Sequence, residues 1–393
     1  MARPKKSEKQ PKAIGSTQSL SAFVKSICDV MRRSNCASAL QYVPELTWIL
    51  FLRILDAQEA RDVEQAEVLG ADFSPALRRP YRWQDWAAPQ GWKRRELFAA
   101  GDGRLFEFIN KELLPHLHGL DVDRRTGLPN PAATAKQRII GRIMTAVERV
   151  RVDDEANLRD ILDRVHEISI ENIDDTHFFT LSQVYEDLLL KMGEKNSDGG
   201  QFFTPREVIR AMVNTVNPSP GQTVYDPCCG TGGFLAVAYE HMARRLGNAP
   251  ASTDIERLKH DTFFGREKEN LVFPIALANL VLHGIDQPNL WHGNSLTGRA
   301  TYAALFERAP PRFDVILTNP PFGGKEGKDA QKNFPFETSA TQVLFVQGIL
   351  SELASGGTCA IVLDEGLLFR TNESAFVETK RKLLDECELW AIV

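Results

Sequence analysis

The sequence lacks the features that mark membrane, secreted and zinc-binding proteins. No run approaches the roughly 18 consecutive apolar residues that a membrane span needs. Residues 1–16 hold scattered basic side chains with no apolar stretch behind them, which is unlike a secretory signal. The six cysteines include no C-x-x-C pair, so neither zinc spacing nor a disulfide framework is indicated. We expect reduced thiols, no bound metal, no membrane contact and a cytoplasmic protein.

An excess of positive charge is also missing. The formal net charge is −5, whereas a protein that binds nucleic acid alone is usually basic. A chain of this composition would need a partner or a local basic groove to hold nucleic acid. Residues 1–17 are predicted to be a disordered basic tail, with a weak phosphate-binding arm as the alternative.

The length of 393 residues favours two domains. Strand patterns are scarce before residue 220, so residues 18–170 are predicted to form a helical N-terminal domain. Its helices are expected at 18–60, 104–116, 134–151 and 155–168. Trp83, Trp86 and Trp92, with nearby prolines, indicate a packed irregular segment. Nothing in this domain looks catalytic.

Residues 171–393 follow a different pattern. After a helix near 181–192 and a flexible loop at 195–200, strands and helices alternate, which predicts an α/β domain with a doubly wound, mostly parallel, Rossmann-like sheet. Residues 248–253 are predicted to be a short polar crossover. The strands are expected at 223–226, 262–265, 290–293, 313–318, 358–363 and 388–393, and the helices at 232–246, 268–283, 339–355 and 374–386.

The most informative motif follows the apolar run 313–318. Asn319, Pro320, Pro321 and Phe322 come directly after it, and prolines cannot continue a sheet ladder. The chain therefore turns at the carboxyl end of a buried strand, where open α/β sheets bind ligands. Asn319 Oδ1 and the Pro320 carbonyl could accept both N–H bonds of a planar amino group while Phe322 stacks on its ring. This arrangement suits methylation of an exocyclic amine.

A second strand ends at Asp226 and runs into a glycine-rich turn. Glycines there let the backbone approach a ligand and expose amide groups, although a tight β–α turn alone would explain them. The turn is not the dinucleotide fingerprint G-x-G-x-x-G. Asp226 would repel a pyrophosphate and suits the cation of a sulfonium amino acid.

Three further positions could complete a donor site. Glu267, after the next strand, could hold both hydroxyls of a ribose, or could simply be a favourable residue at a helix start. Asn294 could bond an adenine amino group. Thr204, Pro205 and Glu207 fit the N-cap, N1 and N3 positions of a capping box. That box leaves the adjacent Phe202 and Phe203 unexplained, and these rings could wall a methionine chain.

In this order, the motifs resemble those of N6-adenine DNA methyltransferases, and more narrowly the modification subunits of type I restriction–modification systems. The similar segments are F-T-P-R-E at 203–207, D-P-x-C-G-T-G-G-F at 226–234 and N-P-P-F at 319–322, with Y-E-D-L-L at 185–189 before them. The helical N-terminal domain is similar too, so the resemblance covers nearly the whole chain.

The resemblance implies S-adenosyl-L-methionine as methyl donor and N6 of a flipped adenine as acceptor. Asn319, Pro320, Pro321 and Phe322 would hold the adenine. The implied partners are DNA and the specificity and restriction subunits of the same system, with two copies of this chain per complex. The implied donor-binding residues are Gln201, Phe202, Phe203, Thr204, Pro205, Arg206, Asp226, Gly230, Thr231, Gly232, Gly233, Glu267 and Asn294.

Two departures from the family pattern affect these expectations. Asn294 stands where related enzymes often have an acidic residue. The chain stops at Val393, where the family usually continues with a β-hairpin and a helical tail, so we expect both to be missing. An inactive donor-binding assembly subunit is therefore an alternative, and a protein-glutamine N5 methyltransferase is another, since a glutamine amide is also a planar NH₂. The segment 323–338, with three lysines, either borders DNA or is a solvated loop.

Overall fold

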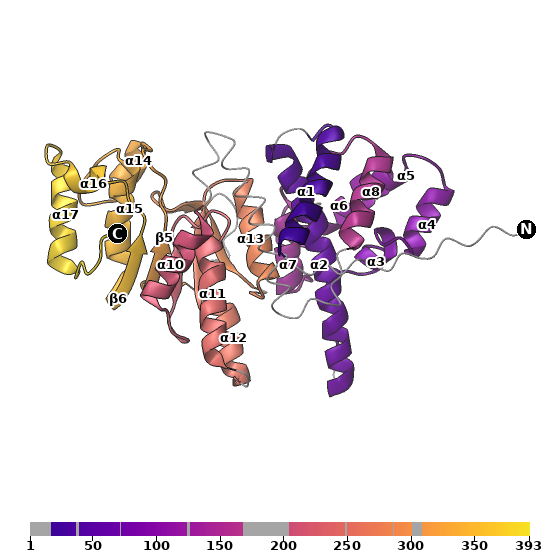
Figure 1. Cartoon of the computed structure of the whole chain (residues 1–393), viewed down its shortest axis with the longest axis horizontal. Helices are drawn as coiled ribbons and strands as arrows, with labels where there is room; N and C mark the ends of the chain where they lie inside the picture. The colour runs from indigo at the N-terminus through magenta and orange to yellow at the C-terminus, as the bar shows by residue number, and fades with distance from the viewer. Residues whose placement is uncertain are drawn as a thin grey trace, which may run out of the picture. The chain divides into compact units, whose positions relative to one another are not determined.

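A computed structural model describes residues 17–36, 39–70, 72–123, 126–167, 204–247, 250–285, 287–300 and 309–393. The chain divides into two compact units, Met1–Leu188 and Leu189–Val393, which Figure 1 colours from indigo to magenta and from red to yellow. The predicted boundary between residues 170 and 171 lies outside the described residues, as do the predicted helix at 181–192 and the loop at 195–200.

The described part of the N-terminal unit is built from helices, as expected. The predicted helix at 104–116 is present as an unbroken stretch that contains one π-helical turn. A capping box begins α7, because Thr134 Oγ1 accepts from Gln137 N–H and the Gln137 side chain accepts from Thr134 N–H. The elements are α1 (Thr17–Arg33), α2 (Ala39–Leu69), α3 (Trp83–Trp86), α4 (Trp92–Ala99), α5 (Arg104–Phe108), η1 (Ile109–Leu113), α6 (Leu114–His118), α7 (Ala135–Met144) and α8 (Glu155–His166).

Tryptophans form the centre of this unit. Trp48, Trp83 and Trp86 are fully buried, and the rings of Trp48 and Trp86 stack with centroids 6.3 Å apart. Trp83 Nε1 donates to His166 Nδ1 at 3.1 Å and thereby ties α3 to α8. Burial lowers the pKa of His166 to about 4, so the ring stays neutral and can accept this bond. Of the three tryptophans predicted to pack, Trp83 and Trp86 are buried, whereas Trp92 is 44% exposed. The segment contains two short helices and is therefore not wholly irregular.

The C-terminal unit is an α/β domain around a six-stranded sheet. Its strand order is β4-β3-β2-β1-β5-β6, with five parallel strands and β4 antiparallel to β3. The prediction of a doubly wound, mostly parallel sheet is confirmed. The strands are β1 (Val224–Asp226), β2 (Phe263–Glu267), β3 (Asn289–Asn294), β4 (Arg299–Ala300), β5 (Phe313–Thr318) and β6 (Leu353–Ile361).

Helices cover both faces of this sheet, as the alternation of side chains along β2 shows. Phe264 packs with Tyr225, Phe313 and Ile349 of α15 on one face. Its neighbour Gly265 points to the other face, against α11, because successive strand residues alternate. The helices are α10 (Arg206–Val216), α11 (Gly233–Leu246), α12 (Ser252–His260), α13 (Val272–Leu282), α14 (Lys328–Gln331), α15 (Thr341–Glu352), α16 (Gly366–Phe369) and α17 (Ser374–Glu386).

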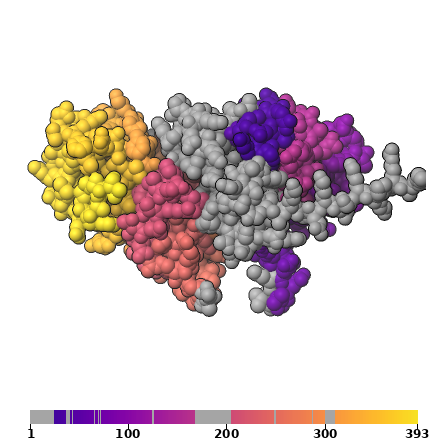
Figure 2. Space-filling model, viewed as in Figure 1, coloured from indigo at the N-terminus to yellow at the C-terminus, as the bar shows by residue number. Residues whose placement is uncertain are grey.

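Several predictions of local structure are wrong, and two of them concern whole elements. The nine-residue helix α12 begins at Ser252, within the segment predicted to be a polar crossover at 248–253, and was missed because its apolar stripe is only Ile255 and Leu258. The strand predicted at 388–393 does not form. An apolar run becomes a strand only when a neighbouring strand pairs with it, and in the described structure none does. Trp390 and Ile392 are 57% and 70% exposed, and the yellow segment after β6 lies on the outside of its unit (Figure 2).

None of the described helices combines the length and the apolar character that a membrane crossing requires.

Gly265 provides a test of how closely the sheet packs under α11. A Cβ at this position would lie 2.6 Å from Leu290 Cδ2 and 3.0 Å from Leu235 Cδ1. We expect Gly265→Ala to lower the free energy of unfolding by about 1–3 kcal/mol, the usual cost of overpacking. The matched control is Gly327→Ala, since nothing lies within 4 Å of its added Cβ. Urea unfolding of both variants is the measurement, and equal stabilities would contradict close packing at Gly265.

Candidate active site

The two predicted site segments meet at the middle of the sheet. β1 ends at Asp226 and β5 ends at Thr318, and these strands are parallel neighbours. The chain leaves β1 toward β2 on one side, while β5 lies on the other. This change of direction makes the switch point at which open α/β sheets bind ligands. The glycine-rich turn and Asn319 therefore lie at the same edge.

The turn after β1 depends on glycine at two positions. Gly230 and Gly232 have φ angles of 54° and 81°, in the left-handed region that glycine adopts without strain. Gly232 N–H donates to the Cys229 carbonyl at 2.8 Å, and α11 begins at Gly233. The first amides of α11 have no partner within the helix, so they can face a ligand.

The Asp226 carboxylate holds this turn to the end of β5. Asp226 is 1% exposed, and its Oδ1 accepts from Thr318 Oγ1 at 2.7 Å and from Cys228 N–H at 3.1 Å. Cys228 Sγ lies 3.0 Å from the same Thr318 hydroxyl. Burial raises the pKa of Asp226 to about 7 against the opposing effect of the Thr318 hydrogen bond. The carboxylate thus has a structural task in addition to any interaction with a cation.

Removal of the Thr318 hydroxyl should destabilise this junction. We expect Thr318→Val to lower the free energy of unfolding by about 1–3 kcal/mol, because a buried carboxylate loses a donor. Thr379→Val is the matched control: Thr379 is also buried, and its hydroxyl finds no partner in the described structure. Denaturant titration of the two variants should show a loss for Thr318→Val alone, and similar midpoints would exclude the proposed role of the hydroxyl.

Glu267, at the end of β2, also forms a hydrogen bond with the glycine-rich turn. Its Oε2 accepts from Gly230 N–H at 2.9 Å and its Oε1 from Glu269 N–H at 2.7 Å. Burial raises the pKa of Glu267 to about 7, although these backbone hydrogen bonds act in the opposite direction. A carboxylate has about four lone-pair sites, so each oxygen keeps acceptor capacity for a hydroxyl group.

The raised pKa of Asp226 predicts a pH dependence of stability. An unfolded aspartate titrates near 4 and the folded one near 7, so between these values the folded state holds one more proton. The contribution of this group to the unfolding free energy is therefore full below about pH 4 and falls by about 1.4 kcal/mol per pH unit up to about pH 7.

Asp226→Asn removes this titration and keeps an Oδ1 acceptor. We expect its stability relative to the wild type to rise between pH 5 and pH 7, as measured by urea unfolding at each pH. A difference between the two proteins that stays constant over this range would contradict a raised pKa at Asp226.

Sequence reasoning missed a residue that supports the turn from α13. Asn279 is fully buried, and its Nδ2 donates to the Thr231 carbonyl at 2.9 Å. The available signal was its chemistry: Asn279 is the one polar residue in the apolar helix V-F-P-I-A-L-A-N-L-V-L. His283 Nδ1 lies 2.8 Å from the Asn279 carbonyl and its Nε2 lies 3.3 Å from Glu240 Oε1.

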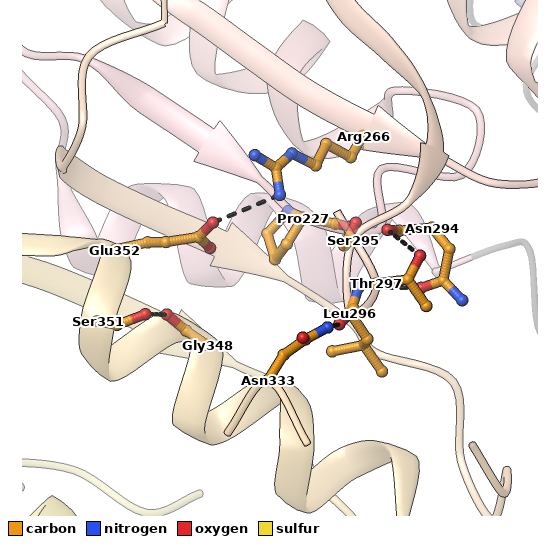
Figure 3. A network of polar contacts seen from close by, with 10 residues as sticks. All are labelled: Pro227, Arg266, Asn294, Ser295, Leu296, Thr297, Asn333, Gly348, Ser351 and Glu352. Atoms are coloured by element: carbon orange, nitrogen blue, oxygen red, sulfur yellow. Dashed lines mark hydrogen bonds and ion pairs between the residues drawn. The ribbon is translucent and has the colours of Figure 1, made fainter. Parts of the chain in front are cut away.

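Asn294 is the last residue of β3, and the turn that follows it contacts the glycine-rich turn after β1. Its Oδ1 accepts from Leu296 N–H at 2.9 Å, and its Nδ2 lies 3.5 Å from Glu326 Oε2. The adjacent Ser295 hydroxyl donates to the Pro227 carbonyl. Figure 3 shows this group at the end of β3, with Asn333 Nδ2 donating to the Leu296 carbonyl at 3.0 Å. The structure therefore brings Asn294 to the same edge as Asp226 and Glu267.

Asn319 is held by one end of its amide. Its Nδ2 donates to Thr204 Oγ1 at 3.0 Å, whereas its buried Oδ1 finds no donor among the described residues. Pro320 is buried beside it, and Phe322 is 44% exposed. A buried acceptor without a partner is costly, so this oxygen is available to a ligand that brings an N–H group.

The capping box predicted at Thr204 and Glu207 is wrong. α10 begins at Arg206 with Pro205 as N-cap, and no side chain caps it. The Thr204 hydroxyl instead accepts from Asn319, 115 residues away, a tertiary contact that the local pattern could not reveal. Arg206 is buried, and its Nη2 lies 3.6 Å from Glu240 Oε1. The predicted residues Gln201, Phe202 and Phe203 lie outside the described structure.

The segment after the N-P-P-F motif folds back on itself. Glu326 N–H donates to the Ser339 carbonyl at 2.8 Å and Thr341 N–H to the Gly324 carbonyl at 3.1 Å. Two of its lysines lie beside acidic groups, Lys328 at 3.8 Å from Glu337 and Lys332 at 3.2 Å from Asp329. These ion pairs reduce the positive field that the segment could offer to a phosphate chain.

The described residues contain no group of three or more metal-ligating side chains. Burial raises the pKa of the Cys228 and Cys229 thiols well above their ordinary value. Both are therefore neutral thiols at physiological pH and not activated nucleophiles.

Two family models match the sequence. The model for the N-6 DNA methylase family covers residues 177–393, and the model for the HsdM N-terminal domain covers residues 20–168. The first matched range contains the α/β part of the chain, and the second contains the helical part.

Curated relatives extend over nearly the whole sequence. The chain is 33% identical to the type I restriction enzyme EcoEI methylase subunit of Escherichia coli, over 95% of this chain and 71% of that protein. It is 28% identical to the StySJI methylase subunit of Salmonella typhimurium, over 93% of this chain and 62% of that protein. Against the latter, the chain thus spans less than two thirds of its relative.

Solved structures agree with this similarity. A modification subunit from Vibrio vulnificus YJ016 has a TM-score of 0.76 and 32% identity, over 96% of this chain and 76% of that one. A chain from a study of assembly and conformational transition of the type I R-M system has a TM-score of 0.71 and 36% identity, over 94% of this chain and 68% of that one.

Proposed function

This chain belongs to the N-6 DNA methylase family, and from that premise we propose that it transfers a methyl group from S-adenosyl-L-methionine to N6 of adenine in DNA as the methyltransferase subunit of a type I restriction–modification complex. The observation that carries the proposal is the Asn319 amide at the carboxyl end of β5, whose buried Oδ1 finds no donor among the residues that the structure describes. The amino group of adenine supplies the missing N–H.

The acceptor half of the site is the turn of Asn319, Pro320, Pro321 and Phe322. Asn319 Oδ1 and the Pro320 carbonyl accept the two N–H bonds of N6 and localise the nitrogen lone pair for attack on the methyl carbon. Because N6 cannot be reached inside a duplex, the adenine leaves the stack, and the exposed ring of Phe322 is available to stack on it. The methylated nitrogen then loses a proton to water, so positioning accounts for most of the catalysis.

The donor half is the turn after β1 with its neighbours. When bound, S-adenosyl-L-methionine supplies an electrophilic methyl group on a sulfonium. The first amides of α11, which have no partner within the helix, the spare acceptor sites of Glu267 and the cation-compatible Asp226 suit its parts. The residues that we propose for this site are Gln201, Phe202, Phe203, Thr204, Pro205, Arg206, Asp226, Gly230, Thr231, Gly232, Gly233, Glu267 and Asn294.

The proposed partners follow from charge and family. The net charge is −5, and Lys328 and Lys332 in the segment after β5 are paired with acidic side chains. Both observations favour recognition of DNA through another chain. We therefore propose a specificity subunit that reads the sequence, a restriction subunit in the same system and two copies of this chain per complex.

The alternatives receive less support. Neither the family model nor the relatives favour protein-glutamine N5 methylation, since both concern DNA methylation. An inactive donor-binding subunit is likewise not favoured, because the described site residues lie together at one sheet edge.

Asn319→Ala tests the acceptor half. We expect methylation to fall by about 10²-fold or more, the usual cost of deleting a group that acts on the reacting atoms, with affinity for the methyl donor nearly unchanged. The measurement is transfer of tritiated methyl groups to unmethylated genomic DNA by the chain with its specificity subunit, together with calorimetric titration of S-adenosyl-L-methionine. Asn372→Ala is the control, since Asn372 is exposed between α16 and α17. Undiminished transfer by Asn319→Ala would refute the mechanism.

A further inference from the structure

The contact between Thr204 and Asn319 links the two halves of the site. Thr204 lies two residues before the start of α10, and Asn319 directly follows β5. Their side chains meet at 3.0 Å. We propose that Thr204 is a positioning residue for methyl transfer: its hydroxyl, oriented by the bound donor, sets the direction in which the Asn319 amide points. The inference rests on the function proposed above and adds a coupling between donor and acceptor.

The first step of the argument concerns the amide. An asparagine side chain has an oxygen that only accepts and an NH₂ that only donates. The target amine of adenine brings N–H groups, so the productive orientation places Oδ1 toward it. In the opposite orientation two NH₂ groups would face each other, and the amine would not be held. Whatever binds the far end of the amide therefore decides whether Asn319 can act.

The second step concerns the hydroxyl. A threonine hydroxyl can donate one hydrogen bond and accept others, so Thr204 alone is compatible with both amide orientations. An anionic acceptor on its other side would accept the hydrogen bond that the hydroxyl donates, so that only oxygen lone pairs would remain for Asn319. The amino-acid part of the methyl donor has a carboxylate, and the N-terminus of α10 beside Thr204 favours negative charge.

The third step excludes the local explanation for Thr204. This residue does not cap α10, because Pro205 is the N-cap and no side-chain capping bond is made. Its hydrogen-bond partner in the described structure is Asn319, in a different element. Donor binding thus fixes the hydroxyl, the hydroxyl fixes Asn319 Nδ2, and Asn319 Oδ1 is presented to the acceptor. Such coupling is reciprocal, so the target base should also strengthen donor binding.

Nuclear magnetic resonance of the full chain labelled with ¹⁵N-asparagine tests this coupling without DNA. The Asn319 side-chain resonance pair is identified by its absence in Asn319→Ala. We expect this pair to shift when S-adenosyl-L-methionine is added to the wild type and to Thr204→Ser, which keeps a hydroxyl. In Thr204→Val the pair should stay unchanged on addition of the donor, while resonances near the glycine-rich turn still report donor binding.

The outcomes are distinct. A shift of equal size in Thr204→Val, or no shift in a wild-type chain that binds the donor, would overturn the coupling and leave the proposed function standing. A folded wild-type chain that binds no donor would overturn the donor half of the proposed function, and the coupling with it. Circular dichroism of each variant shows whether the fold is kept.

Kinetics provide a second readout that a purely structural role would not move. With the specificity subunit and genomic DNA, Thr204→Val should lower kcat by about tenfold, the upper range for loss of one neutral hydrogen bond. Its KM for the donor should change less than kcat, and Thr204→Ser should restore most of the rate. An increase in the donor KM with unchanged kcat would mean that Thr204 serves only donor binding, which would refute the positioning role.

Discussion

The site depends on the parallel pairing of β1 with β5. At the end of the two strands, a hydrogen bond from Thr318 to Asp226 secures this pairing. The pairing brings together two segments that are 92 residues apart, and the side-chain bond joins their last residues. Beyond this bond, one strand continues into the glycine-rich turn and the other into the N-P-P-F turn. Any displacement of the two strands would change the distance between a donor methyl group and an acceptor nitrogen.

Support for this junction comes from several polar side chains. Glu267 accepts a hydrogen bond from Gly230 N–H, Asn279 donates to the Thr231 carbonyl, and Ser295 donates to the Pro227 carbonyl. Each group reaches the turn from a different element: the end of β2, α13 and the turn after β3. Arg266 of β2 also lies 3.5 Å from Glu352 of α15 (Figure 3). The turn is thus held by its carbonyls and amides from several directions, while the start of α11 keeps amides for a ligand.

The sequence predicted most of the sheet because buried parallel strands and glycine-rich turns have local signatures. The bounds of β5 were predicted correctly, and Asp226 and Asn319 were placed at the sheet edge by their position after apolar runs. The tertiary partners were not predictable in this way. Thr204 fits a capping box by spacing, yet its hydroxyl bonds Asn319 across the fold. Residues 388–393 have the composition of a strand, but a strand also requires a neighbour, which composition cannot reveal.

The burial of Asp226 and Glu267 has a consequence for how a cation enters the site. Both carboxyl groups have pKa values near 7, so near neutral pH each is protonated for part of the time. A sulfonium close to either group favours its ionised form. In the function that we propose, binding of the positively charged donor is therefore linked to release of protons into solution, and departure of the neutral product, which lacks that charge, is linked to their uptake. The difference in charge between substrate and product donor thus becomes a difference in affinity that favours exchange of one for the other after each transfer.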